Sequence, residues 1–344
     1  MDITIVIGVL LMLYIAWSIG ANDAANPTSC VVGAGVLNIK KALILFSIFV
    51  FLGSVLQGWM VMKTFGGGVT EIRSIYDAIV ATLAAGIWIT LASYSGMPIS
   101  TTHSAVGGVL GIGLAHTLLY GYTSIRYDVL LKVVISWITS PLSSILLTFI
   151  IYKTLVKLYK LLEVRGLDPD KVFRYLAIFS LAFSAYSFGA NDVSNSTGVY
   201  VAIIKVSGYS VGGIDIVVAI ILAVIGALGI IIGGFTVGAK VITTVALKIT
   251  RLDLISGVAA GLSNALVVWV FTTIPYIMFG YGMPISTTHA AVSAVIGAGL
   301  FKGRSRSINK FTIINIVSSW LLTVPLTALI ALGLRILIHN ILNV

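Results

Sequence analysis

Two shortages in the sequence, of charge and of cysteine, narrow what the protein can be. Only 9% of the 344 residues are charged, whereas a soluble domain carries about 25% charged residues, so the chain cannot cover itself with a water-facing surface. Cys30 is the only cysteine, which excludes disulfides within the chain and metal sites built from several cysteines. The N-terminus has no basic segment before its first apolar run, so we expect no cleavable signal peptide.

What the sequence has in abundance is apolar residues. Hydrophobic residues make up 58% of the chain, and the mean hydropathy is +1.10. Runs of roughly 20 apolar residues, the length that crosses a bilayer as a helix, recur throughout. The net charge of +10 does not indicate a nucleic-acid partner, because the Lys and Arg residues lie in gaps between apolar runs and form no continuous face. We predict an all-α polytopic protein in the lipid bilayer of a cell membrane.

The two halves of the chain contain the same motifs in the same order. The matching segments are GANDAAN (20–26) and GANDVSN (189–195), two copies of GMPISTTH (96–103 and 282–289), and a weaker pair, SWITSPLSS from Ser136 and SWLLTVPLTA from Ser319. The chain is therefore an internal duplication. We divide it into an N-terminal membrane repeat (1–157), a cytoplasmic linker (158–173) and a C-terminal membrane repeat (174–344).

Each repeat divides into about five apolar stretches, which we predict to be membrane spans. Their approximate bounds are 3–37, 42–62, 76–95, 97–118 and 128–157 in the first repeat, and 174–206, 211–239, 254–281, 284–301 and 311–338 in the second. The first stretch of each repeat is too long for one straight span and carries the GAND motif near its middle, and a proline precedes each S-T-T-H. We therefore expect broken or re-entrant helices at both motifs.

An odd number of spans per repeat would insert the second repeat upside down. With the N-terminus outside, most of the 21 Lys and Arg residues fall in cytoplasmic loops, as the positive-inside rule requires. Equivalent loops also differ in charge. The loop after the first S-T-T-H stretch has Arg126, whereas its counterpart has Lys302, Arg304, Arg306 and Lys310. We predict two inverted-topology repeats with both termini outside.

Two acidic residues lie inside apolar stretches, at matching places in the repeats. Asp23 and Asp192 each cost about 2.5–3.5 kcal/mol to bury in a membrane, whereas Asp77 and the other acids fall in loops or at helix ends. Asn26 and Asn195 follow the two aspartates by three residues and so share a helical face with them. We favour Na⁺ ligands over simple helix caps, since carboxylate and amide oxygens suit a hard cation; a proton on the carboxylate is the alternative.

The repeated S-T-T-H motif predicts an anion site. Each copy follows a proline, Pro98 or Pro284, that suits the start of a helix. A helix that starts inside the membrane directs unpaired N–H groups and the positive end of its dipole at the interior. The donors we single out are Ser100, Thr101, Thr102, Ser286, Thr287 and Thr288. The small residues after the first copy, SAVGGVLGIGLA, predict close helix packing.

The four histidines are weaker candidates. We expect His103 and His289, which end the two motifs, to be hydrogen-bonded structural residues rather than ligands or proton carriers. His116 and His339 lie near the ends of spans, and the sequence assigns them no role.

The two motifs together suggest coupled transport. Two helix starts that face each other would present donors to one anion, and two nearby aspartates would repel a dianion unless cations occupied the gap. Cation binding would then be a condition for anion binding. An aspartate near the anion would favour phosphate over sulfate, because phosphate at neutral pH keeps a proton that it can donate.

On these motifs the sequence resembles the inorganic phosphate transporter family, the Pit-type permeases, over nearly its whole length. The resemblance implies a dimeric, inverted-repeat symporter of phosphate with Na⁺ or H⁺, with no resident cofactor. It implies phosphate-binding residues at Asn22, Ser100, Thr101, Thr102, Asn191, Ser286, Thr287 and Thr288, and Na⁺ ligands at Asp23, Asn26, Asp192 and Asn195. The repeats differ just after GAND, where Pro27, Thr28 and Ser29 stand against Ser196, Thr197 and Gly198, so the two cation sites need not be equivalent.

Three alternatives remain at this stage. The same scaffold could carry sulfate or another oxyanion. An anion channel is disfavoured, because uncompensated buried aspartates would oppose anion passage. An intramembrane hydrolase is disfavoured, because an enzyme has no need of two inverted copies of its site.

Overall fold

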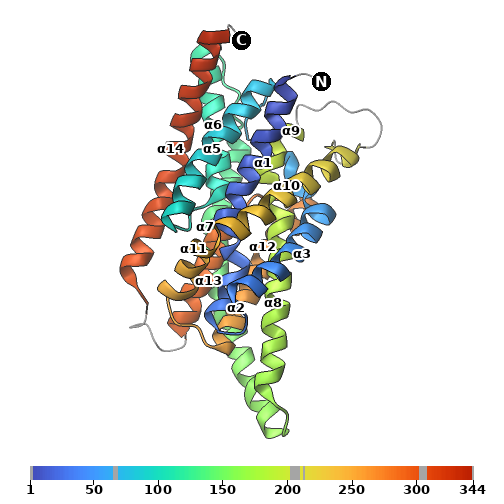
Figure 1. Cartoon of the computed structure of the whole chain (residues 1–344), viewed down its shortest axis with the longest axis vertical. Helices are drawn as coiled ribbons and strands as arrows, with labels where there is room; N and C mark the ends of the chain where they lie inside the picture. The colour runs from blue at the N-terminus through green and yellow to red at the C-terminus, as the bar shows by residue number, and fades with distance from the viewer. Residues whose placement is uncertain (1–2, 65–68, 202–209, 212–213, 302–307, 343–344) are drawn as a thin grey trace.

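The computed structural model describes residues 3–64, 69–201, 210–211, 214–301 and 308–342, and it is almost entirely helical (Figure 1). The helices are α1 (Ile3–Asp23), α2 (Ala25–Gly33), α3 (Ile39–Gln57), α4 (Trp59–Lys63), α5 (Ile75–Ser95), α6 (Thr101–Tyr120), α7 (Tyr127–Val164), α8 (Pro169–Asp192), α9 (Ser194–Val201), α10 (Ile216–Thr236), α11 (Ala239–Thr243), the π-helix η2 (Thr244–Lys248), α12 (Leu254–Phe279), α13 (Thr287–Phe301) and α14 (Lys310–Leu342). Two strands of two residues each, β1 (Ser210–Val211) and β2 (Ile214–Asp215), pair antiparallel before α10.

Eight helical segments of the described chain are long and apolar enough to cross a membrane. They are Val6–Gly33, Ile39–Gln57, Ile75–Ser95, Tyr127–Val164, Pro169–Val201, Ile216–Thr236, Leu254–Phe279 and Lys310–Leu342. Four lie in each half, whereas five per repeat were predicted: α6 and α13, which occupy the remaining predicted stretches, are not among these segments. The predicted linker is shorter than expected because α7 continues to Val164 and α8 begins at Pro169. The basic residues Lys205, Lys302, Arg304 and Arg306, which entered the charge count, lie outside the described residues.

The first helices of the two halves, α1 and α8, run in opposite directions in Figure 1. α1 starts at the end of the molecule that carries both termini, whereas α8 starts at the opposite end, beside the turn from α7. Hydrogen bonds show that α5 runs parallel to α1. Tyr14 of α1 meets Thr90 of α5, and further along Asn22 meets Ser93. α1 also packs against α10, and α8 packs against α12 and α3.

The glycine of each GAND motif marks a place where two helices cross in backbone contact. A Cβ atom on Gly20 would lie 1.8 Å from the carbonyl oxygen of Ile230 in α10, and one on Gly189 would lie 2.2 Å from that of Val50 in α3. Neither crossing leaves room for a methyl group. The predicted close packing after S-T-T-H is also present, since a Cβ on Gly107 of α6 would lie 1.9 Å from a side-chain oxygen of α14. Small residues let helices approach in this way.

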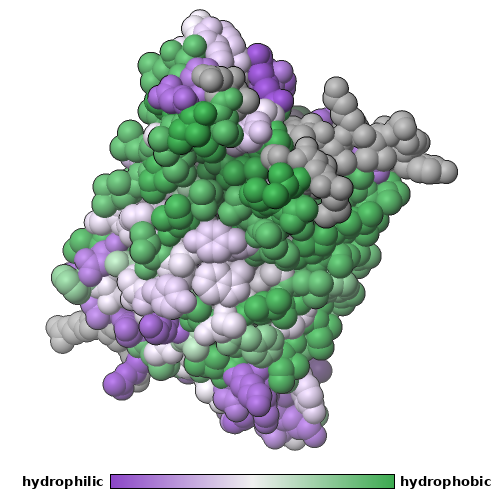
Figure 2. Space-filling model, turned by 45° about the horizontal axis from the view of Figure 1, so that its top comes forward, coloured by the Kyte–Doolittle hydropathy of each residue, from purple (hydrophilic) through white to green (hydrophobic). Residues whose placement is uncertain are grey.

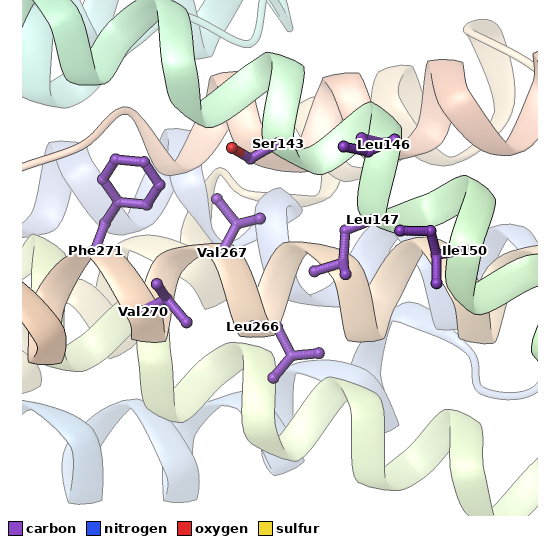
Figure 3. Close-up of a pocket in the computed structure, with 8 residues that line it drawn as sticks. All are labelled: Ser143, Leu146, Leu147, Ile150, Leu266, Val267, Val270 and Phe271. Atoms are coloured by element: carbon purple, nitrogen blue, oxygen red, sulfur yellow. The ribbon is translucent and has the colours of Figure 1, made fainter.

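The surface suits a lipid environment. Figure 2 shows a broad hydrophobic face with hydrophilic residues gathered toward its ends. Leu142 and Leu146 of α7 and Leu321 of α14 are more than half exposed. A groove of about 240 Å³ between α7 and α12 is lined by apolar side chains and a single hydroxyl, that of Ser143 (Figure 3). Such a groove offers an anion almost nothing to bind.

A buried ion pair joins the first repeat to the last helix, which the sequence did not indicate. Asp77 caps the start of α5, as its predicted helix-end position requires, but it is only 1% exposed. Its carboxylate lies 2.8 Å from Nε of Arg335 in α14 and 3.3 Å from Nε2 of His116 in α6. His116 also lies 3.0 Å from the hydroxyl of Ser124. The prediction of no role for His116 is therefore wrong: α6 and α14 cover the helix start and supply its partners.

Candidate functional site

The two aspartates of the GAND motifs lie at helix ends in the middle of the bundle. α1 ends at Asp23 and α2 begins at Ala25, while α8 ends at Asp192 and α9 begins at Ser194. Both aspartates are fully buried. Each accepts a hydrogen bond of 2.5 Å from a hydroxyl of its own repeat, Asp23 from Thr101 and Asp192 from Thr287. The GAND and S-T-T-H motifs of each repeat therefore meet, as the duplication led us to expect.

Hydroxyls also cross between the repeats. Thr102 donates to the carbonyl oxygen of Ile285 at 2.8 Å, and Thr288 donates to that of Ile99 at 2.9 Å. Thr288 also lies 3.0 Å from the second carboxylate oxygen of Asp23. The two S-T-T-H segments are thus bonded directly to each other, which brings both helix starts to one place.

Asn22 and Asn191 hold the extended segments that precede α6 and α13. The Asn22 amide donates to Met97 O at 3.0 Å and to Ser93 Oγ at 3.1 Å, and its oxygen accepts from Ile99 N at 3.1 Å. The matching contacts of Asn191 are donation to Met283 O at 2.9 Å and to Thr272 Oγ1 at 2.8 Å, and acceptance from Ile285 N at 3.3 Å. Both amides are hydrogen-bonded to protein partners, so their contacts position the extended segments that precede α6 and α13, called the anion segments below because we predict an anion site there. The sequence indicated no role for Ser93 and Thr272.

Asn26 and Asn195 reach across to the opposite repeat. Asn26 Nδ2 lies 3.2 Å from Thr287 Oγ1 and 3.1 Å from Thr288 Oγ1, and Asn195 Nδ2 lies 3.1 Å from Thr102 Oγ1. Within the described part of the chain, the Oδ1 atoms of Asn26 and Asn195 have no hydrogen-bond partner, although both are buried. Oδ1 of Asp192 is also buried and has no hydrogen-bond partner among the described residues. A buried oxygen without a partner is unfavourable, and these three oxygens are of the kind that binds a hard cation.

The helix starts supply the complementary donors. Ser100 caps α6 by accepting from the backbone N–H of His103 at 3.1 Å, and Ser286 accepts from that of His289 at 3.1 Å. Both serines are fully buried. The first N–H groups of a helix have no acceptor within it, and the dipole makes this end positive. Two buried helix starts therefore face the aspartates with donors that suit an anion.

A row of four rings in tilted and edge-on contact crosses the boundary between the repeats beside these helix starts. The rings of His103 and His289 have centroids 4.5 Å apart, and each packs at 3.8 Å on a tryptophan, His103 on Trp137 and His289 on Trp320. Nδ1 of His289 lies 3.4 Å from the Trp137 carbonyl oxygen. The hydrogen bonds expected of these histidines are found only at Nδ1 of His289. Both ring nitrogens of His103 and Nε2 of His289 have no hydrogen-bond partner among the described residues, so the rings are held mainly by packing. Both tryptophans belong to the weaker repeat SWITSPLSS and SWLLTVPLTA, the one sequence signal that could have found them.

Comparison with known proteins gives a consistent result. The phosphate transporter family profile matches residues 19–331. A Pyrococcus furiosus protein provisionally named a phosphate permease is 32% identical, and the match covers 96% of this chain and 95% of that protein. An Arabidopsis thaliana protein named inorganic phosphate transporter 2-1, chloroplastic, is 28% identical, with 94% of this chain and 70% of that protein covered.

A solved structure is similar as well. It is described as the sodium-dependent phosphate transporter, and it matches with a TM-score of 0.84 and 29% identity over 99% of this chain and 100% of that chain. The family and these relatives are transporters and permeases, not enzymes. The resemblance predicted from the two motif pairs is confirmed: this chain belongs to the phosphate transporter family.

Proposed function

We propose that the chain is a secondary active symporter that moves inorganic phosphate across a cell membrane together with Na⁺. The observation that carries this proposal is the pairing of each buried aspartate with a hydroxyl of an S-T-T-H helix start, Asp23 with Thr101 and Asp192 with Thr287. Potential cation ligands and potential anion donors are thus in direct contact at one buried place, in two copies.

The two sets of residues have separate roles in this proposal. Phosphate binds between the helix starts through Ser100, Thr101, Thr102, Ser286, Thr287 and Thr288, with Asn22 and Asn191 beside it. Na⁺ binds at Asp23, Asn26, Asp192 and Asn195. The buried oxygens of Asp192, Asn26 and Asn195 that have no hydrogen-bond partner among the described residues support the cation sites, because a hard cation would satisfy them.

Coupling follows from charge. The Asp23 and Asp192 carboxylates lie next to threonines that we assign to the anion site. A phosphate dianion brought to this place meets two negative charges in surroundings of low dielectric, where repulsion is strong. Bound Na⁺ removes that repulsion and so raises the affinity for phosphate. By linkage, bound phosphate raises the affinity for Na⁺ by the same factor.

The arrangement of the repeats completes the proposal. We take 1–157 and 174–344 as inverted membrane repeats joined by a cytoplasmic linker, with helices broken at the GAND and P-I-S-T-T-H motifs and both termini outside. The opposite directions of α1 and α8 support the inversion (Figure 1). So do the matching sets of contacts around Asn22 and Asn191. We further propose that two copies of the chain associate in the membrane.

The test is uptake of radiolabelled phosphate into proteoliposomes under an imposed Na⁺ gradient or an imposed pH gradient, with excess sulfate as competitor. We expect uptake that depends on the Na⁺ gradient and resists sulfate. Uptake driven only by the pH gradient would make the aspartates proton carriers and would refute the Na⁺ assignment. Inhibition by sulfate would point to a general oxyanion permease, and no phosphate uptake under either gradient would refute the proposal.

A further inference from the structure

Two cationic hollows flank the central site, one beside each repeat's anion segment. The first has a volume of about 530 Å³ and is lined by Tyr94, Ser95, Lys240, Thr243, Thr244 and Lys248. The second has a volume of about 300 Å³ and is lined by Lys63, Thr64, Arg126, Val129, Phe279 and Tyr281. Neither group of lining residues includes an acidic side chain.

The hollows occupy equivalent places in the two repeats. The first lies between the end of α5 and the helices α11 and η2, which follow α10. The second lies between the end of α12 and the helix α4, which follows α3. The start of α7 also lines it, through Arg126 and Val129, whereas no residue of the equivalent helix α14 is among those that line the first. Because α5 and α12 lead directly into the two P-I-S-T-T-H segments, each hollow lies where the chain turns toward the central site.

The hollows also lie toward opposite ends of the bundle. α5 runs alongside α1, away from the end that carries the chain termini, and α12 runs alongside α8, toward that end (Figure 1). The end of α5 and the end of α12 therefore point in opposite directions. A ligand held in one hollow would reach the centre from one side, and a ligand held in the other from the opposite side.

Charge and hydroxyl groups suit both hollows to an oxyanion. Lys240 and Lys248 line the first, and Lys63 and Arg126 line the second, all with exposed side chains. In the first, Lys240 Nζ lies 5.7 Å from the ring centroid of Tyr94. In the second, the hydroxyl of the lining residue Tyr281 lies 3.2 Å from Nζ of Lys132, a lysine outside the lining. A cleft of one charge between apolar walls concentrates ions of the opposite charge and raises their rate of association.

The floors of the hollows differ. In the second, Thr64 donates to Gly282 O at 2.9 Å, and Gly282 N donates to Met60 O at 2.6 Å, so α4 is bonded to the chain just before Pro284. In the first, the equivalent threonine, Thr244, donates to Lys240 O within its own helical segment at 3.3 Å. The first hollow is the larger of the two. Its threonine donates its hydrogen bond within its own helical segment and not to the chain before Pro98.

We propose that these hollows are two peripheral oxyanion sites, one for each side of the membrane, which capture a divalent tetrahedral oxyanion before it reaches the centre. This inference rests on the proposed function and adds the route of access. The first hollow, at the end away from the termini, serves the linker side of the membrane. The second serves the side of the chain termini.

The test is phosphate uptake with each side presented separately. Lys240→Gln/Lys248→Gln and Lys63→Gln/Arg126→Gln are reconstituted into proteoliposomes, and the fraction of each orientation is measured by trypsin cleavage of the linker at Arg165. Lys157→Gln/Lys160→Gln is the matched control, because it removes the same charge at the linker end from exposed residues outside the hollow.

We expect Lys240→Gln/Lys248→Gln to raise KM for phosphate offered on the linker side by about ten-fold, and Lys63→Gln/Arg126→Gln to do so only on the terminus side. High salt should shrink both effects, and Lys240→Arg/Lys248→Arg should restore KM. Three results would overturn the inference in a preparation whose wild-type protein takes up phosphate. The KM of each hollow variant could change equally on both sides, it could change no more than in the Lys157→Gln/Lys160→Gln control, or it could stay at the wild-type value. Absence of wild-type uptake would instead refute the proposed function, and this inference with it.

Discussion

Asp23 and Asp192 occupy matching positions in the two repeats, but their surroundings differ. Asp23 accepts a hydrogen bond from Thr101 at one carboxylate oxygen. The hydroxyl of Thr288, from the opposite repeat, lies 3.0 Å from the other oxygen and shares its one proton between that oxygen and the Ile99 carbonyl oxygen. Asp192 accepts from Thr287 at one oxygen, and its other oxygen has no hydrogen-bond partner in the described residues. A cation that binds Asp192 displaces fewer existing bonds, so we expect the Asp192 site to bind Na⁺ more tightly than the Asp23 site.

The sequence difference between the repeats lies beside this asymmetry. Pro27, Thr28 and Ser29 follow GAND in the first repeat, where the second has Ser196, Thr197 and Gly198. All six residues are buried. A duplicated motif therefore does not require a duplicated function, and the two cation sites that we propose can differ in strength within a nearly symmetric frame. Four sets of substitutions test how far this difference between the repeats extends, and they are ordered by the size of the expected effect.

The largest effect is expected at the buried ion pair. Asp77 of the first repeat pairs with Arg335, whereas the matching turn of α12 carries a capping box of Asp253 and Ser256. Arg335→Leu removes the guanidinium beside the buried carboxylate, which keeps only His116 and its backbone hydrogen bonds, and should destabilise the protein by about 3–5 kcal/mol. Thermal unfolding in detergent measures this. Adding Asp77→Asn should recover part of the loss, and a double variant no more stable than Arg335→Leu would contradict the explanation.

The next effect concerns the aspartates. Asp192→Asn should weaken Na⁺ activation of uptake by about 100-fold, and Asp23→Asn by about ten-fold, because the threonines already satisfy the Asp23 carboxylate. The measurement is the Na⁺ concentration that gives half-maximal phosphate uptake. The asparagine side chain is close to isosteric with aspartate, so unfolding temperatures should control for damage to the fold. Equal effects of Asp192→Asn and Asp23→Asn would contradict the predicted difference in Na⁺ affinity between the two sites.

A smaller effect is expected where the helices cross. Gly20→Ala and Gly189→Ala should each destabilise the protein by about 1–3 kcal/mol, because the added methyl group meets a backbone oxygen. Gly20→Ala should cost more, since its Cβ lies closer to that oxygen, at 1.8 Å against 2.2 Å. Gly333→Ala is the control, because a Cβ there has no neighbour within 4 Å. If all three variants unfold at one temperature, backbone contact does not explain the GAND glycines.

The smallest effect is expected at the asparagines that bridge the repeats. Asn26 donates to two threonines and Asn195 to one. Without Na⁺, Asn26→Ala should therefore cost about 1 kcal/mol more stability than Asn195→Ala, the contribution of about one hydrogen bond. Stabilisation by added Na⁺ should fall in both variants if their free oxygens are ligands. Full retention of that stabilisation would exclude Asn26 and Asn195 as Na⁺ ligands.

The sequence predicts much of this arrangement because the motifs are duplicated. Buried aspartates at matching places, and prolines before S-T-T-H, were enough to predict that the aspartates would lie beside the S-T-T-H segments; that the helices are broken at both motifs stays a prediction. The bond from Thr288 to Asp23 could not be predicted, because it joins residues from different repeats and has no counterpart at Asp192. The ion pair between Asp77 and Arg335 could not be predicted from the sequence either. A helix-end aspartate is usually solvated, and Arg335 lies 258 positions away. Only tertiary packing decides such contacts.

The hydrogen bonds from Thr102 to Ile285 and from Thr288 to Ile99 have a consequence for how such a protein could have arisen. Each repeat contributes a donor and an acceptor that only the other repeat can satisfy, so one repeat made alone contains half a site. With the inversion that we propose, a shorter ancestral gene with a single repeat would have needed to insert its product into the membrane both ways up, and to pair the two forms. Fusion of two copies would have removed that need by fixing one copy in each orientation.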